Sequence, residues 1–143
     1  MSTLNPLDDG FCFACGPHNP DGLQMQFERD GERGARAVVA LPERVQGYRA
    51  VAHGGIVATL LDEGMAHACR FAGHKAMTAS MDLRFRKPVP LGTPLTVRGR
   101  CTEQRKNVLF LEASVEHDGV VLASATGKFL SYGPLRLEEQ TRA

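Results

Sequence analysis

The residues best suited to chemistry lie in the stretch His53–Arg70, HGGIVATLLDEGMAHACR. Gly54 and Gly55 stand where a helix would begin, and the only carboxylates of the stretch, Asp62 and Glu63, are adjacent near its middle. The first turn of a helix has unpaired N–H groups and the positive end of the helix dipole, which favour negative charge. A carboxylate can activate water as a general base. The stretch therefore contains residue types that water-activating chemistry requires.

A helical wheel separates this stretch into an apolar side and a side of small residues around Asp62. The apolar side predicts contact with a sheet, and the small side would let another backbone or a thin ligand come close. An alternative is that Asp62 is one solvated position of an ordinary amphipathic helix. Glu63, His67 and Arg70 are interpreted as a solvent-facing polar edge. The apolar side consists of Ile56, Val57, Leu60 and Leu61, and the small side of Gly55, Ala58, Thr59, Asp62, Ala66 and Cys69.

Length and composition indicate an ordinary globular protein. The 143 residues predict one domain over residues 1–143, with an N-terminal cap at 1–21 and a polar tail at 134–143. A net charge of +1 gives no reason to expect nucleic acid or a membrane surface as a partner. No apolar run approaches the roughly 20 residues of a transmembrane helix, and the N-terminus lacks the features of a signal peptide. We therefore expect a cytoplasmic protein with reduced thiols.

Two of the four cysteines, Cys12 and Cys15, form a CxxC pair. A zinc site would need a second CxxC or a CxxH, whereas Cys69 and Cys101 are far apart. A redox motif would need a neighbouring βαβ unit, which the sequence does not predict. The pair is interpreted as part of a structured N-terminal turn, and no metal is expected.

Alternation of apolar and polar residues predicts several strands around one helix. Asp30-Gly31 and Asp118-Gly119 are typical of hairpin turns, and Gly73 is suited to end the helix. One apolar-faced helix and an antiparallel sheet of five to six strands predict an α+β fold in which the sheet wraps the helix. The predicted strands are Leu23–Phe27, Ala35–Leu41, Met81–Phe85, Leu95–Arg100, Val108–Glu116 and Val120–Leu130, and the predicted helix is His53–Arg70.

From about Cys12 to Tyr132 the chain resembles the hotdog-fold thioesterases, in particular the PaaI-like branch that hydrolyses acyl-coenzyme A. The strongest motif is HGGxxxxxxD, formed by His53, Gly54, Gly55 and Asp62. Four further motifs agree with it: CFxCGxxNPxGL at 12–23, Gln46-Gly47-Tyr48, Thr78 at the start of a strand, and the FxxP of Phe85 and Pro88.

The resemblance implies a role for each matching residue. Asp62 would activate or align the attacking water, and Thr78 would hold that water. Gly54 would donate its backbone N–H to the thioester carbonyl, while His53 shapes the loop. Some members carry an asparagine at the position of Gly47, and here Gln46 is the candidate substitute. Substrate contacts are expected at Gly55 and Gln46, and the basic cluster Arg84, Arg86 and Lys87 is expected to receive the phosphates of coenzyme A.

Distance along the helix predicts that the site is shared between two chains. Gly54 and Asp62 are eight residues apart, about 12 Å at 1.5 Å per residue, which is too far for both to reach one thioester carbon. Two antiparallel helices related by a two-fold axis would bring Gly54 of one chain near Asp62 of the other. We therefore expect a homodimer, or a dimer of dimers (a homotetramer), as the resemblance also implies.

No cofactor is expected, because coenzyme A is part of the substrate. Water would attack the thioester directly or through a transient anhydride with Asp62. Two other functions fit the pattern: a hotdog enoyl-CoA hydratase or dehydratase, which pairs a carboxylate with a histidine, and a non-catalytic acyl-CoA-binding module.

Overall fold

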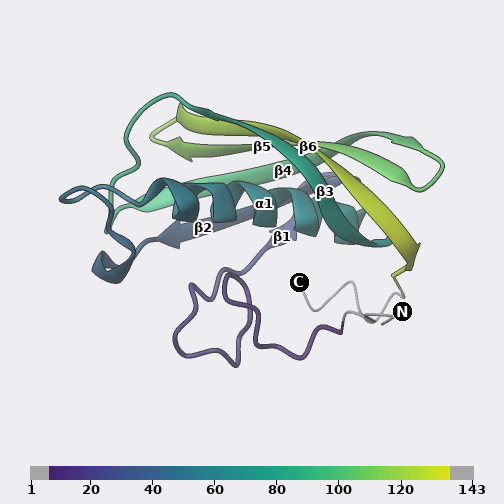
Figure 1. Ribbon diagram of the computed structural model, residues 1–143, viewed down its shortest axis with the longest axis horizontal. Coiled ribbons are helices and arrows are strands. Elements are labelled where there is room, and N and C mark those ends of the chain that lie inside the picture. Colours follow the sequence, from purple (N-terminus) through teal and green to yellow (C-terminus); the bar gives the residue numbers. More distant parts are fainter. Residues whose placement is uncertain (1–6, 136–143) are drawn as a thin grey trace.

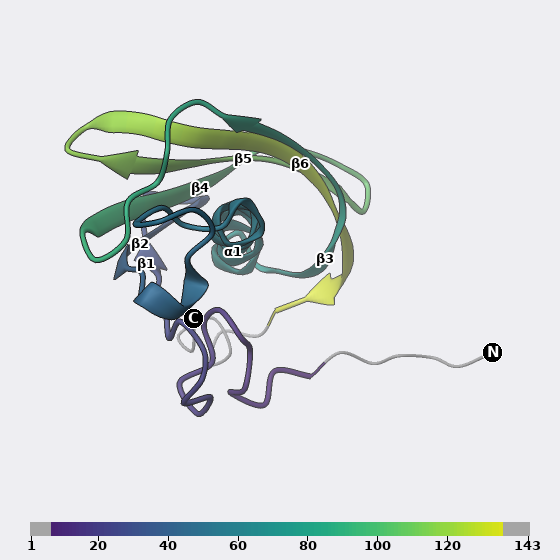
Figure 2. The ribbon, with the colours of Figure 1, turned by 60° about the vertical axis from the view of Figure 1, so that its left-hand side comes forward.

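The computed structural model describes residues 7–135 and has one long helix lying against a strongly curved sheet (Figures 1 and 2). This α+β arrangement confirms the hotdog fold that the sequence resemblance implied. In chain order the elements are β1 (Glu28–Arg29), β2 (Gly34–Ala40), the 3-10 helix η1 (Glu43–Val45), α1 (Gly54–Phe71), β3 (His74–Phe85), β4 (Pro94–Arg105), β5 (Val108–His117) and β6 (Val120–Pro134).

All neighbouring strands of the six-stranded sheet are antiparallel, in the order β1-β2-β4-β5-β6-β3. The connection through α1 carries the chain from β2, near one edge of the sheet, to β3 at the other edge. Both predicted hairpin turns are present, with positive φ at Gly31 and at Asp118 and Gly119. The helix therefore lies inside the curve of the sheet, and β3 is an edge strand beside it (Figure 2).

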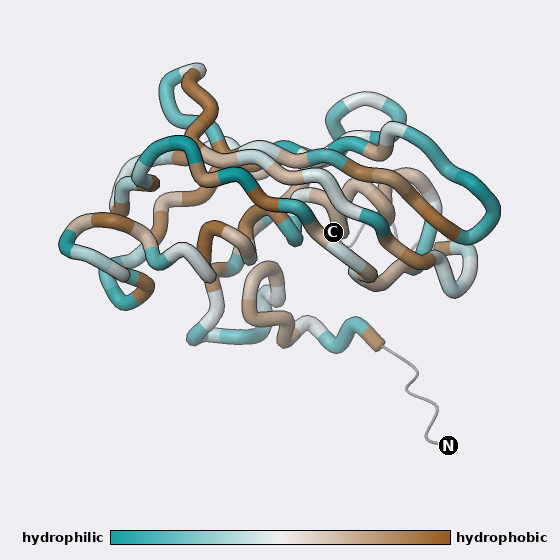
Figure 3. The backbone as a smooth tube through the Cα atoms, turned by 45° about the horizontal axis from the view of Figure 1, so that its top comes forward, coloured by the Kyte–Doolittle hydropathy of each residue, from teal (hydrophilic) through white to brown (hydrophobic). Residues whose placement is uncertain are grey.

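The core forms between α1 and the inner face of the sheet. Val57, Leu60 and Leu61 are buried and Ile56 is partly buried, which confirms the predicted apolar side of the helix. The helix approaches β4 very closely, because a Cβ atom built on Gly99 would lie 1.9 Å from the carbonyl oxygen of Gly64. Hydropathy changes repeatedly from residue to residue along the strands, as expected for a sheet with one covered face (Figure 3). Within residues 7–135, no helix is long and apolar enough to cross a membrane.

The predicted strand Leu23–Phe27 is wrong, since the first strand contains only Glu28 and Arg29. The backbone N–H groups of Leu23 and Met25 donate to Phe13 O and Ala14 O of the N-terminal loop, at 2.8 and 2.9 Å. The alternation of apolar residues in this segment therefore reflects burial under the loop and not a sheet ladder.

The edge strand β3 also differs from its prediction. It begins at His74, seven residues before Met81, and its register shifts between Thr78 and Ser80. Alternation predicted a half-buried strand, but the side chains of Met81 and Phe85 are 38% and 56% exposed. The single helix of one chain does not cover this end of the curved sheet.

The polar edge predicted on the helix is also wrong. His67 is only 4% exposed and its ring stacks on Phe27 at 4.3 Å, while Glu63 lies beside it with a mostly buried side chain. The N-terminal loop runs beside this side of the helix, and Sγ of Cys12 lies 3.8 Å from Oε1 of Glu63 (Figure 2). At the other end of the chain, Pro134 belongs to β6 and Leu135 is buried, so the prediction of a tail is wrong for these two residues; residues 136–143 lie outside the described part.

Candidate active site

The start of α1 presents one open backbone donor. His53 caps the helix, with its Nδ1 accepting the N–H of Gly55 at 2.9 Å. The carbonyl of His53 accepts the N–H groups of Ile56 and Val57 at 2.9 and 3.1 Å. Within residues 7–135 the N–H of Gly54 has no acceptor, and a Cβ atom on Gly54 would meet nothing within 4 Å. The cap thus leaves one N–H at the positive end of the helix open to a ligand.

Asp62 and Thr78, which the sequence placed in one site, are in direct contact. Thr78 lies on β3, and its hydroxyl donates to Oδ1 of Asp62 at 2.7 Å. Partial burial raises the pKa of Asp62, the hydrogen bond from Thr78 opposes that rise, and the neighbouring charge of Glu63 adds to it. A carboxylate with a raised pKa is better matched to general-base catalysis near neutral pH than an ordinary one.

One chain does not bring the two ends of the predicted site together. Gly54 is the first residue of α1 and Asp62 lies eight residues later, which corresponds to about 12 Å along the helix axis. Asp62 therefore has its hydroxyl partner, Thr78, within the chain. The open N–H of Gly54 lies at the start of the helix, away from this pair.

Gln46 lies in the loop that leads to the helix and stabilises its turn. Its Oε1 accepts the N–H of Ala50 at 3.0 Å, and Ala50 has a positive φ of 63°. A Cβ atom on Gly47 would lie 3.0 Å from Cα of His53, so a side chain at this position would crowd the helix cap. The role of Gln46 at a substrate carbonyl stays a prediction.

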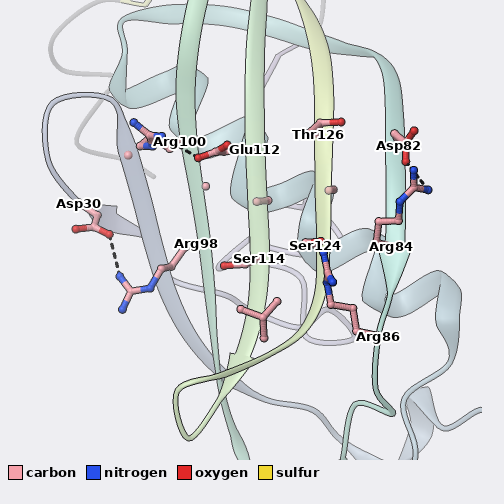
Figure 4. A pocket seen from close by; sticks show the side chains of 15 residues that line it. Asp30, Asp82, Arg84, Arg86, Arg98, Arg100, Glu112, Ser114, Ser124 and Thr126 are labelled. Carbon is pink, nitrogen blue, oxygen red and sulfur yellow. Dashed lines mark hydrogen bonds and ion pairs between the residues drawn. The ribbon is translucent and has the colours of Figure 1, made fainter.

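The basic cluster lies on the other face of the sheet. Arg84 and Arg86 line a cavity of about 750 Å³ on the face opposite α1, together with Arg98 and Arg100 of β4 (Figure 4). Arg84 is paired with Asp82 at 3.0 Å. Lys87 is exposed just beyond the end of β3 and is not among the residues lining this cavity. Within one chain these cations are not brought to Asp62, so their contact with substrate phosphates stays a prediction.

Sequence reasoning did not connect a second group of reactive side chains. The thiols of Cys12 and Cys15 lie beside the carboxylate of Glu63, with these ligand atoms within 4.8 Å of one another. Spacing could identify the two cysteines, but it could not identify a third group about 50 residues away on a helix.

Comparison with known proteins agrees with the fold. The sequence pattern of the thioesterase superfamily matches residues 50–124, which include His53, Asp62 and Thr78. Among curated proteins, the acyl-coenzyme A thioesterase THEM4 of Bos taurus is 27% identical over 119 residues, covering 80% of this chain and 49% of its own length. The chain therefore spans about half the length of the curated relatives it matches.

Solved structures show the same architecture. A thioesterase superfamily protein superposes with a TM-score of 0.81 and 26% identity, over 92% of this chain and 69% of its own. The PaaI protein of the E. coli phenylacetic acid degradation operon superposes with a TM-score of 0.73 and 21% identity, over 79% and 83% of the two chains. The match to the family pattern covers more than half of the chain, and the fold agrees with it: the protein belongs to the thioesterase superfamily.

Proposed function

We propose that the protein hydrolyses an acyl-coenzyme A thioester to a free acid and coenzyme A. The observation that carries the proposal is the hydrogen bond between Asp62 of α1 and Thr78 of β3. The same helix begins with the open N–H of Gly54. Membership of the superfamily and the similarity to acyl-coenzyme A thioesterases support the same reaction.

In this mechanism water lies against Asp62 and Thr78. Asp62 removes a proton as the water attacks the thioester carbonyl, and the Thr78 hydroxyl orients the carboxylate and the water. Negative charge gathers on the carbonyl oxygen, where the Gly54 N–H donates to it. When the C=O bond re-forms, the C–S bond breaks and the coenzyme A thiolate leaves, taking up the proton that Asp62 removed from the water. One such preorganised donor lowers the barrier by about 3 kcal/mol, and a general base contributes about 10²- to 10⁴-fold.

A second copy of the chain is proposed to complete the site. The outer edge of β3 pairs with no strand within the described residues, and this 12-residue strand carries Met77, Met81 and Phe85 exposed. A long apolar edge left open in water would favour pairing with another chain. A two-fold axis beside β3 would cover these side chains and set Gly54 of one helix against Asp62 of the other.

Coenzyme A is the proposed carrier of the acyl group. A structural neighbour from Streptococcus mutans with 20% identity, which shows similarity of fold, was crystallised bound to acetyl CoA. Arg84, Arg86 and Lys87 are the proposed contacts for its phosphates. The proposed compartment is the cytoplasm, in keeping with the four free cysteines, and residues 1–143 are proposed to form one domain.

A panel of acyl-CoA esters with short aliphatic, medium aliphatic and aryl chains tests the proposal. Release of free thiol, followed with a thiol reagent, is the expected result for at least one class of ester. Turnover of an enoyl-CoA without thiol release would indicate a hydratase instead. Saturable binding of the esters with no turnover would indicate a binding module and would overturn the hydrolase.

Replacement of Thr78 by valine separates the role of the hydroxyl from that of the carboxylate. The variant loses the hydrogen bond that opposes the rise in the pKa of Asp62, so this pKa should rise further. Because the base acts when deprotonated, the acidic limb of the pH–rate profile should move to higher pH. The maximal rate should fall by less than the roughly 10²-fold expected for loss of the base itself.

The control for this change is Thr102→Val, which removes an exposed hydroxyl that donates to Phe110 O and not to Asp62. Its pH–rate profile should match that of the wild type. An unmoved acidic limb in Thr78→Val would exclude the hydroxyl from the site.

A further inference from the structure

The N-terminal loop and the middle of α1 meet at a group of three metal-ligating side chains. Sγ of Cys12, Sγ of Cys15 and a carboxylate oxygen of Glu63 all lie within 4.8 Å of one another. Within residues 7–135, they form the one group of three or more His, Cys, Asp or Glu side chains this close together. We propose that Cys12, Cys15 and Glu63 bind a zinc ion that joins the N-terminal loop to the helix carrying Asp62.

The spacing of the donor atoms suits tetrahedral zinc. Zn–S bonds of about 2.3 Å and Zn–O bonds of about 2.0–2.2 Å place neighbouring donors roughly 3.5–3.8 Å apart. Oε1 of Glu63 is 3.8 Å from Sγ of Cys12. The remaining pairs lie within 4.8 Å, so a contraction of about 1.3 Å at most would close the site around the ion. Three protein ligands leave the fourth position for water or another small ligand.

The loop that carries the two cysteines is held in shape by its backbone. The N–H of Gly16 donates to Cys12 O at 2.9 Å, and a Cβ atom on Gly16 would lie 2.4 Å from the backbone nitrogen of Cys12. Glycine at this position allows the tight turn that places both thiols on one side. Bonds from Leu23 N to Phe13 O and from Met25 N to Ala14 O fix the turn to the next segment. These hydrogen bonds already order the loop, so metal binding would lose little further conformational entropy.

The third ligand is supported from behind by a buried histidine. Oε1 of Glu63 faces Cys12, while Oε2 lies 3.2 Å from Nε2 of His67. His67 is 4% exposed and is held by the stacked ring of Phe27. Metal-binding carboxylates are commonly oriented by a second group of this kind. The arrangement assigns Oε1 to the ion and Oε2 to His67.

The ion also explains why a carboxylate and two partly buried sulfurs lie together. The side chain of Glu63 is only 13% exposed, and its contact with the Cys12 thiol is long. Thiols form only weak hydrogen bonds, so these three partly buried side chains gain little from one another when neutral. When ionised, the two thiolates and the carboxylate would repel one another. Zinc replaces the two thiol protons and offsets most of the negative charge. Glu63 of the helix thereby supplies the third ligand that the single CxxC pair lacks.

Zinc and cobalt binding to the full chain tests this site. The protein is purified under reducing conditions, stripped with a chelator, and titrated with Zn²⁺ against a chromophoric chelator and with Co²⁺ as a spectroscopic probe. We expect one ion per chain, a sulfur-to-cobalt charge-transfer band, and a higher thermal transition with Zn²⁺ than without it. Cys15→Ser should weaken the band, because only one thiolate is left, and Glu63→Gln should bind zinc at least about 10-fold more weakly, since loss of even an outer-shell partner has an effect of that size.

The matched control is Cys101→Ser, which alters a buried thiol outside the cluster and should leave affinity and stoichiometry unchanged. Absence of bound zinc in the wild type, or a cobalt complex without the charge-transfer band, overturns the proposal. Equal zinc affinity in Glu63→Gln and wild type overturns the ligand set, even if Cys15→Ser fails to fold. None of these readouts depends on thioester hydrolysis.

Discussion

Replacing Asp62 with asparagine should reduce the rate of thioester hydrolysis by about 10²- to 10⁴-fold, the contribution expected of a general base. Asparagine has the same shape and can still accept the hydrogen bond from Thr78, so the change removes little besides the charge and basicity. The loss should appear in kcat measured with a saturating acyl-CoA. An unchanged kcat would remove Asp62 from the mechanism.

The same variant should be no less stable than the wild type at neutral pH. Burial raises the pKa of Asp62 in the folded chain above its ordinary value of 3.8, so the folded state binds more protons than the unfolded state between the two values. Stability contributed by the protonated form is present below 3.8 and is lost as pH rises through the folded pKa. Asparagine cannot ionise, so its thermal transition should equal or exceed that of the wild type at pH 7. The control is Asp82→Asn, an exposed carboxylate paired with Arg84, which should change neither kcat nor this pH dependence.

Removing the N–H of Gly54 should have a comparably large effect. Proline suits the first position of a helix and has no N–H, and His53 before it has an extended ψ of 137° that proline tolerates. Loss of one oxyanion donor is expected to reduce kcat by about 10²- to 10³-fold in Gly54→Pro. Stopped-flow or steady-state thiol release measures the change.

Gly54→Ala is the matched control, because it adds a methyl group and keeps the N–H. A Cβ atom on Gly54 meets nothing within 4 Å in one chain, so helix and cap should be preserved in both variants. Equal rates for the alanine and proline variants would show that the N–H itself has no role and that only space at this position matters.

Local signals in the sequence were sufficient for the elements that position the proposed site. The predicted helix, His53–Arg70, agrees with Gly54–Phe71 to within one residue at each end. The agreement is close because glycines mark both ends of the helix and an apolar repeat marks its buried side. The Asp-Gly pairs predicted the two hairpin turns. The resemblance assigned Asp62 and Thr78 to one water molecule, and their hydrogen bond is a finding of the structure.

The features that could not be predicted depend on contacts between distant segments. The environment of Glu63 and His67 is set by a loop some 50 residues earlier, so a helical wheel assigned them to solvent. The register shift at Thr78 and the exposed inner residues of β3 depend on how far the curved sheet extends beyond the part that the helix covers. Side-chain periodicity carries no information about either.

Mixing two inactive variants tests the shared site most directly. Asp62→Asn and Gly54→Pro chains, coexpressed with different tags and isolated as mixed dimers, should regain activity, because one of the two sites then has both an intact base and an intact donor. An unfractionated mixture should recover about a quarter of the wild-type rate, since half of the dimers are mixed and each keeps one intact site of two. Mixed dimers as inactive as their parents would place base and donor in one chain and contradict the account.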